Sequence, residues 1–219
     1  MKFDRKKRHV NCEKEDGYDY EVEVESNTPM QLDGIVEDFL VRTRRLLLIG
    51  EIDETASTHI CNYLQLFSLR KEPVYMYINS PGGCISSGYA IIDQMLACSC
   101  PVWTIVRGQA HSMGAMIAAF GQKGCRFATP NSSMMLHSMI IQSTRDYIEK
   151  NISMINYLED DFRRKVAELS RRLRIDPKQL ATDMHNTKWM SPKQAIKIGL
   201  IDGVWTPKME LKVNKGYAK

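Results

Sequence analysis

The fold of this 219-residue chain is decided at residues 74–83, which read Val74-Tyr75-Met76-Tyr77-Ile78-Asn79-Ser80-Pro81-Gly82-Gly83. The first half of the stretch is an apolar strand, and a helix-like segment begins near Ser87. Proline removes one backbone donor, and the two glycines permit backbone angles that are closed to other residues. The loop can therefore turn an N–H towards a ligand with no side chain between them, as an oxyanion hole requires. An ordinary strand-to-helix turn uses the same residue types.

Strands and helices alternate on both sides of this stretch. The expected strands are short and apolar throughout, at residues 46–49, 74–78, 102–106 and 133–137. The expected helices lie between or after them, at residues 56–69, 87–97 and 113–121. Fully apolar strands that alternate with helices indicate a largely parallel sheet covered by helices, which is an α/β fold.

A longer helix is expected from Asp146 to Arg174. Its apolar residues recur at helical spacing, at Ile148, Ile152, Ile155, Phe162, Val166, Leu169 and Leu173. Its charged residues, Asp161 and Lys165 among them, are expected on the other faces. A helix with such an apolar stripe needs a surface to cover, on its own domain or on another subunit.

A candidate nucleophile lies in the run Gly108-Gln109-Ala110-His111-Ser112-Met113-Gly114-Ala115. Ser112 stands at the start of the expected buried helix, where backbone N–H groups and the helix dipole favour an alkoxide and the oxyanion it creates. A serine that only caps the helix would have the same pattern. His137 ends a short apolar strand and is the candidate base, because a serine hydroxyl is a weak nucleophile until an imidazole takes its proton.

These segments, together with Pro130-Asn131-Ser132 and Gly199-Leu200-Ile201-Asp202, closely resemble the ClpP family, the proteolytic subunits of Clp proteases. The resemblance implies that Ser112 is the nucleophile and His137 the general base. It also implies that the N–H groups of Gly83 and Met113 hold the oxyanion. The implied architecture is the crotonase-like ClpP fold, a spiral of strand-helix units with a projecting helical handle.

The resemblance and the composition together divide the chain into three parts. Residues 1–29 are expected to be an N-terminal tail or arm, residues 30–208 a ClpP-like serine peptidase domain, and residues 209–219 a C-terminal tail. The handle would be formed by the long helix. The glycine-rich strand that usually follows the catalytic histidine in this family is replaced here at residues 138–143, which predicts an altered contact between rings.

The clearest departure from the family is a missing acid. Aligned backwards from Trp189, the aspartate of the catalytic triad falls on Thr187, and counted forwards from His137 it falls on Asn186. Neither is a carboxylate, but an amide carbonyl can still accept from an imidazole N–H. Asn186, or else Thr187, is therefore the hypothetical third member, with Asp183 as the next candidate.

Other features of the composition exclude several classes of function. The net charge of +4, from 30 basic and 26 acidic residues, describes a mixed surface rather than a nucleic-acid interface. The six cysteines lack metal-ligand spacing, and no metal or cofactor is expected. No apolar run is long enough to cross a membrane, and no secretion signal opens the chain, which favours a cytoplasmic protein.

The resulting hypothesis is a serine endopeptidase subunit of a self-compartmentalised Clp-type protease. It would assemble into homo- or hetero-oligomeric rings and cleave unfolded polypeptide delivered by an AAA+ unfoldase. A catalytically weak or inactive regulatory ring subunit is the main alternative, because the triad aspartate is missing. An acyl-CoA enzyme of the same crotonase-like fold is a second alternative, but it would not use a serine and a histidine at this spacing.

Overall fold

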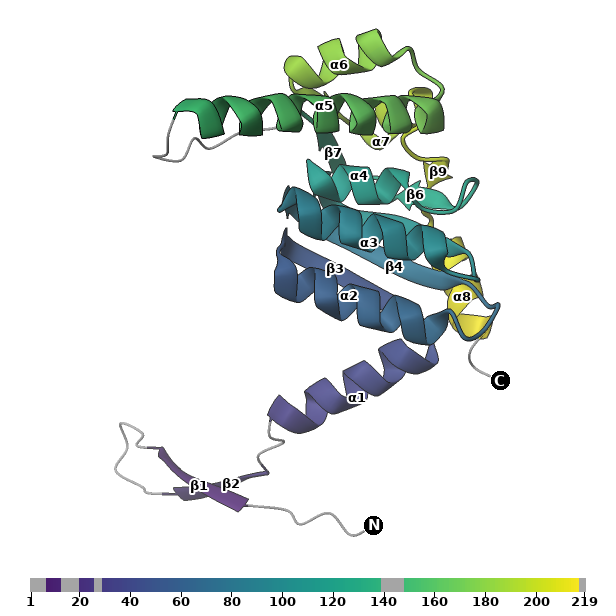
Figure 1. Cartoon of the computed structure of the whole chain (residues 1–219). Coiled ribbons are helices and arrows are strands. Elements are labelled where there is room, and N and C mark those ends of the chain that lie inside the picture. The colour runs from purple at the N-terminus through teal and green to yellow at the C-terminus, as the bar shows by residue number, and fades with distance from the viewer. Residues whose placement is uncertain (1–6, 13–19, 26–28, 139–147, 217–219) are drawn as a thin grey trace. The chain divides into compact units, whose positions relative to one another are not determined.

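The computed structural model describes residues 7–12, 20–25, 29–138 and 148–216 (Figure 1). The chain divides into two compact units, residues 1–43 and 44–219. In the first unit, strands β1 (Lys7–Cys12) and β2 (Tyr20–Glu25) form an antiparallel pair, and helix α1 (Pro29–Arg42) follows them. The expected boundary at residue 30 falls at the start of α1. The division into tail, domain and tail stays a prediction.

The second unit is built on a seven-stranded sheet. Five strands follow one another across it in the order β3 (Arg45–Ile52), β4 (Val74–Gly83), β5 (Val102–His111), β6 (Arg126–Ala128) and β9 (Gly203–Val204). All of these pairs are parallel. Strand β7 (Ser133–Leu136) pairs in parallel with the end of β5, and β8 (Lys188–Met190) adds an antiparallel edge to β7. The predicted α/β fold with largely parallel strands is confirmed.

Helices cover one face of the sheet, where α2 (Glu54–Phe67), α3 (Ile85–Ala97) and α4 (Met113–Ala119) lie side by side (Figure 1). The four remaining helices are α5 (Ile148–Leu173), α6 (Pro177–His185), α7 (Pro192–Lys197) and α8 (Pro207–Gly216). Local sequence fixes several helix starts. The Asp53 side chain accepts from the N–H of Ala56, and Ser191 forms a capping box with Gln194.

Helix α5 matches the long helix expected from the apolar stripe. Its C-terminal half is packed into the unit through Val166, Leu169 and Leu173, which are all buried. Towards its N-terminus, Ile152 and Tyr157 are 53% and 62% exposed. Exposed apolar residues that lie together commonly mark a surface for contact with another molecule. The segment expected to alter the ring contact lies outside the described residues from position 139 onwards.

Residues near the C-terminal end of the chain pack on the opposite face of the sheet. Residues of a strand alternate between the two faces, and Tyr77 of β4 packs there with Trp205 and with residues of α8. Glu210 of α8 collects donors from several elements: it accepts from the Tyr77 hydroxyl at 3.1 Å, from Trp205 Nε1 at 2.8 Å and from Arg107 Nη2 at 2.6 Å. Residues 209–216, expected as a tail, thus lie in a helix that is docked on the sheet.

Removal of the Glu210 carboxylate should loosen this docking. We expect Glu210→Ala to lower the free energy of unfolding by about 2 kcal/mol, because a half-buried acceptor of several charged or buried donors is lost. The matched control is Glu159→Ala, which removes an exposed ion pair with Arg163 and should change stability by less than about 0.5 kcal/mol. Urea unfolding at fixed protein concentration measures both, and equal effects would contradict the proposed role of Glu210.

Candidate active site

Ser112 lies in a strained turn between β5 and α4. Its backbone has φ 53° and ψ −121°, in a region that residues other than glycine rarely adopt. Its N–H donates to the Met135 carbonyl at 2.8 Å. The loop at the end of β4 packs directly against this turn, since a Cβ built on Gly82 would lie 2.6 Å from the Ser112 Cβ and 2.8 Å from the His111 carbonyl oxygen. Glycine is therefore required at position 82, and the turn is held by backbone contact.

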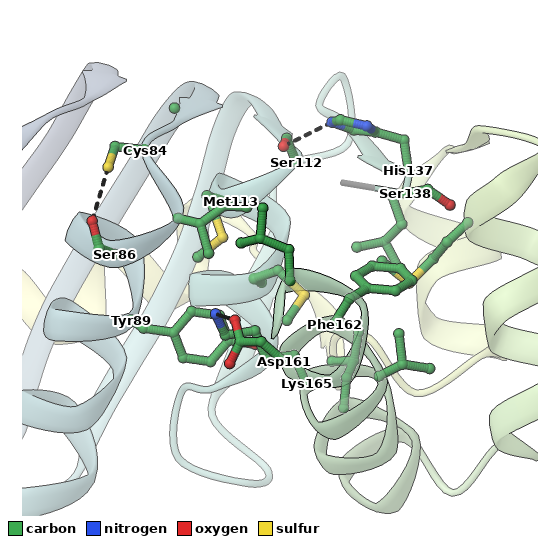
Figure 2. Close-up of a pocket in the computed structure, with 18 of the residues that line it drawn as sticks. Cys84, Ser86, Tyr89, Ser112, Met113, His137, Ser138, Asp161, Phe162 and Lys165 are labelled. Atoms are coloured by element: carbon green, nitrogen blue, oxygen red, sulfur yellow. Dashed lines mark hydrogen bonds and ion pairs between the residues drawn. The ribbon is translucent and has the colours of Figure 1, made fainter. Parts of the chain in front are cut away.

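His137 reaches the serine because of the sheet register. Strands β5 and β7 are parallel, with His111 opposite Met135, so both end at the same edge of the sheet. His137 follows β7 directly, and its Nε2 lies 2.8 Å from Ser112 Oγ (Figure 2). The structure thus brings together the two residues that the sequence named as nucleophile and base.

The two candidate oxyanion donors flank Ser112. Met113 is the first residue of α4, and the first N–H groups of a helix have no partner within it. Gly83 has φ 149° and packs on β3 so closely that an added Cβ would lie 2.4 Å from the Ile52 carbonyl oxygen. Both residues line the same cavity as Ser112 and His137. Backbone N–H groups in this position can stabilise a negative charge that develops on a bound carbonyl oxygen.

The cavity beside Ser112 and His137 has a volume of about 760 Å³. Its walls come from helices α3, α4, α5 and α6 and from the ends of β4 and β7. They are mostly apolar, with Met113 and Met116 from α4 and Met154, Leu158 and Phe162 from α5. Such a space suits the side chain of a bound peptide. The chain can therefore hold a carbonyl compound with its reacting carbon next to Ser112.

Several polar residues of this cavity were not singled out from the sequence as site residues, among them Cys84, Asp161 and Lys165. Cys84 follows Gly83 and caps α3, and hydrogen bonds from Ser86 and Ser87 lower the pKa of its thiol to about 7. Asp161 and Lys165 of α5 also line the cavity, although the stripe pattern placed them among the outward charges. The position of Cys84 beside a candidate oxyanion glycine was a usable signal, whereas nothing in the stripe marked the other two.

No carboxylate completes a triad among the described residues. The one hydrogen bond of His137 there is with Ser112, and neither Asn186 nor Thr187 bonds to its ring. Position 187 lies just beyond the end of the β7–β8 ladder: Lys188 pairs with Leu136, and Thr187 and His137 are the next residues of the two segments. Asp183 is engaged elsewhere, because it binds Lys188 and accepts from Gln179 Nε2 at 3.1 Å.

The second imidazole near Ser112 points away from it. His111 Nε2 lies 2.9 Å from Ser133 Oγ, and its ring contacts Trp189 edge to face at 4.8 Å between centroids. Burial lowers the pKa of His111. Alternation along the strand explains this, since neighbours in an extended segment face opposite sides. The described part of the chain thus contains two serine–histidine pairs, of which only Ser112–His137 lines the cavity.

The described segments hold no group of three histidine, cysteine or acidic side chains arranged for a metal ion. None of their helices has the length and apolar character needed to span a bilayer. Five cysteines are free thiols: Cys61, Cys84, Cys98, Cys100 and Cys125.

Comparison with known proteins shows the family of the chain. The family model described as Clp protease matches residues 30–208. The ATP-dependent Clp protease proteolytic subunit of Ligilactobacillus salivarius (strain UCC118) is 35% identical over 184 residues, which cover 79% of this chain and 88% of the relative. The subunit of the same name from Leuconostoc citreum (strain KM20) is 33% identical over 183 residues, 80% of this chain and 90% of the relative. The chain therefore belongs to the Clp protease family, and its mixed sheet with flanking helices is the fold of that family.

Proposed function

We propose that this serine peptidase of the Clp protease family cleaves peptide bonds with Ser112 as nucleophile and His137 as general base. The observation that carries the proposal is the distance of 2.8 Å between Ser112 Oγ and His137 Nε2 at the mouth of an apolar cavity. His137 takes the proton from Ser112 as Oγ attacks the peptide carbonyl carbon, and it returns that proton to the leaving amine. The N–H groups of Gly83 and Met113 hold the oxyanion of the first tetrahedral intermediate, which collapses to the acyl-enzyme as the amine leaves. They hold a second oxyanion when water, whose proton passes to His137, attacks the acyl-enzyme and releases the acid and free Ser112.

A residue without charge completes the triad in this proposal. Thr187 or Asn186 orients the His137 ring by accepting from its Nδ1–H, and the strand register favours Thr187. A hydroxyl or amide oxygen can fix the tautomer but cannot stabilise the imidazolium as a carboxylate does. Peptidase activity is therefore low but above background. This distinguishes the chain from an inactive regulatory subunit, which would have no need of the Ser112–His137 pair.

The partners follow from the relatives. Their names describe ATP-dependent protease subunits, and this sequence has no G-x-x-x-x-G-K-[ST] phosphate-binding loop. An AAA+ unfoldase therefore hydrolyses the ATP and delivers unfolded polypeptide. The exposed apolar residues of α5 fit contact with further ring subunits, identical or not. We place this assembly in the cytoplasm.

The nucleophile is tested by removing its hydroxyl. Ser112→Ala should reduce hydrolysis of a fluorogenic peptide by at least about 10²-fold, because covalent catalysis is lost. The matched control is Ser133→Ala, which removes the hydroxyl of the other serine–histidine pair. It should change the rate by less than about twofold, which corresponds to a very small change in the activation free energy. If purified Ser112→Ala cleaved the peptide as fast as the unmutated enzyme, Ser112 would not be the nucleophile.

The third triad position is tested by installing the missing charge. Thr187→Asp should raise kcat for the same peptide by about tenfold or more, since an aspartate in this role is worth up to about 10⁴ in a chymotrypsin-like protease. Asn186→Asp is the companion variant and should have the smaller effect, because position 186 lies one residue farther than position 187 from the end of the β7–β8 ladder. If neither raises the rate and the unmutated chain is already fast, an acid elsewhere serves His137 and the assignment of this region is wrong.

A further inference from the structure

The cavity beside Ser112 ends in a polar wall. Its sides are apolar, but Asp161 and Lys165 lie together with Tyr89 at the end away from Ser112 and His137 (Figure 2). Lys165 and Asp161 are one turn apart on α5 and form an ion pair. Tyr89 comes from α3, so two helices that approach each other across the cavity build this end.

The contacts of the pair fix its position. Lys165 Nζ also lies 4.4 Å from the centre of the Tyr89 ring, a cation–π contact. The side chains of Lys165 and Asp161 are 22% and 18% exposed, so both are largely removed from bulk water. Asp161 has a second cation, Arg164, at 3.2 Å, but that side chain is 64% exposed and does not line the cavity.

Hydrogen-bonding capacity at this end of the cavity is not fully used. An ammonium group has three donors, and Lys165 directs one of them to Asp161. The Tyr89 hydroxyl is buried and has no hydrogen-bond partner among the described residues. Buried polar groups are normally satisfied. A bound group or water is therefore expected at this end when the cavity is in use.

The chemistry of the pair discriminates among side chains that enter the cavity. An apolar tip would strip water from the pair and give no hydrogen bond in return. A second carboxylate would be repelled by Asp161, and a second ammonium by Lys165. A primary amide suits both partners, because its carbonyl oxygen accepts from Lys165 and its NH₂ donates to Asp161.

We propose, on the basis of the proposed roles of Ser112 and His137, that the Asp161–Lys165 pair makes the peptidase favour glutamine immediately before the scissile bond. The carbonyl that Ser112 attacks belongs to the residue whose side chain lies nearest Ser112, so that side chain enters the adjoining cavity. The long, flexible stem of glutamine matches the apolar sides, and its amide meets the polar end.

The test uses the assembled full-length enzyme and two fluorogenic peptides that differ only by glutamine or leucine before the scissile bond. The unmutated enzyme should have the higher kcat/KM for the glutamine peptide. Lys165→Met, which keeps the length of the stem and removes the charge, should lower the glutamine-to-leucine ratio by about tenfold. Arg164→Met is the matched control, because it removes the second cation that binds Asp161, and this cation lies outside the cavity. It should change the glutamine-to-leucine ratio by less than about twofold relative to the unmutated enzyme.

Three outcomes would overturn the specificity: a preference of the unmutated enzyme for leucine, a ratio unchanged in Lys165→Met, or an equal fall in Arg164→Met. A second variant, Asp161→Asn with Lys165→Met, leaves no unpaired charge in the cavity and should show the same loss if the single variant fails to fold. Labelling of Ser112 by a fluorophosphonate separates the two proposals. If Ser112 is labelled but the ratio is unchanged in Lys165→Met, or neither peptide is cleaved, only the proposed specificity is refuted. If Ser112 is not labelled and neither peptide is cleaved, the catalytic proposal is refuted as well.

Discussion

The backbone of Ser112 is the constraint on which the site depends. A positive φ at a residue with a side chain costs on the order of 1–3 kcal/mol and persists only where the surroundings enforce it. Here the Met135 carbonyl accepts from its N–H on one side, and the glycine loop at the end of β4 leaves no room on the other. The strain directs Oγ out of the sheet edge towards His137. The same turn starts α4, so Met113, the first residue of that helix, lines the cavity as well.

The far end of α4 is held as firmly as its start. The carbonyl groups of Ala119 and Gly121, at and just after the end of the helix, accept from Arg172 of α5, and Arg126 of β6 also donates to Ala119. Asp202 in turn binds Arg126. Burial raises the pKa of Asp202, but hydrogen bonds from the Arg126 side chain and backbone outweigh this effect and lower it overall. Two guanidinium groups at the negative end of the helix dipole thus fix the element that carries the nucleophile.

Local sequence predicted most of what is short-range. The apolar strands, the helices between them and the Ser112 turn follow from residue pattern, and the parallel register then places His137 without further information. Features that depend on contacts between distant parts of the sequence could not be predicted in this way. The contacts of Glu210 are one example, because they depend on Tyr77 and Arg107 of strands far away in the sequence. Likewise, a charge on a striped helix is normally solvated, and only the approach of α3 encloses Asp161 and Lys165.

The third position of the triad shows why alignment along the chain was not enough. The sequence leaves two candidates, Asn186 and Thr187, and the pairing of β7 with β8, which ends at Leu136 and Lys188, is the basis on which we propose Thr187. The same pairing brings Trp189 against His111, which draws that imidazole to Ser133 and away from the cavity. The two serine–histidine pairs are therefore kept apart, because the neighbouring residues His111 and Ser112 face opposite sides of the chain.

Covalent labelling of the unmutated protein tests whether Ser112–His137 is the catalytic pair. After reaction with a fluorophosphonate, intact mass and peptide mapping locate the adduct. We expect one adduct per chain, on Ser112, because its Oγ lies 2.8 Å from His137 Nε2 and the residue shares its cavity with Gly83 and Met113. An adduct on Ser133, or no adduct on the folded and assembled protein, would contradict it.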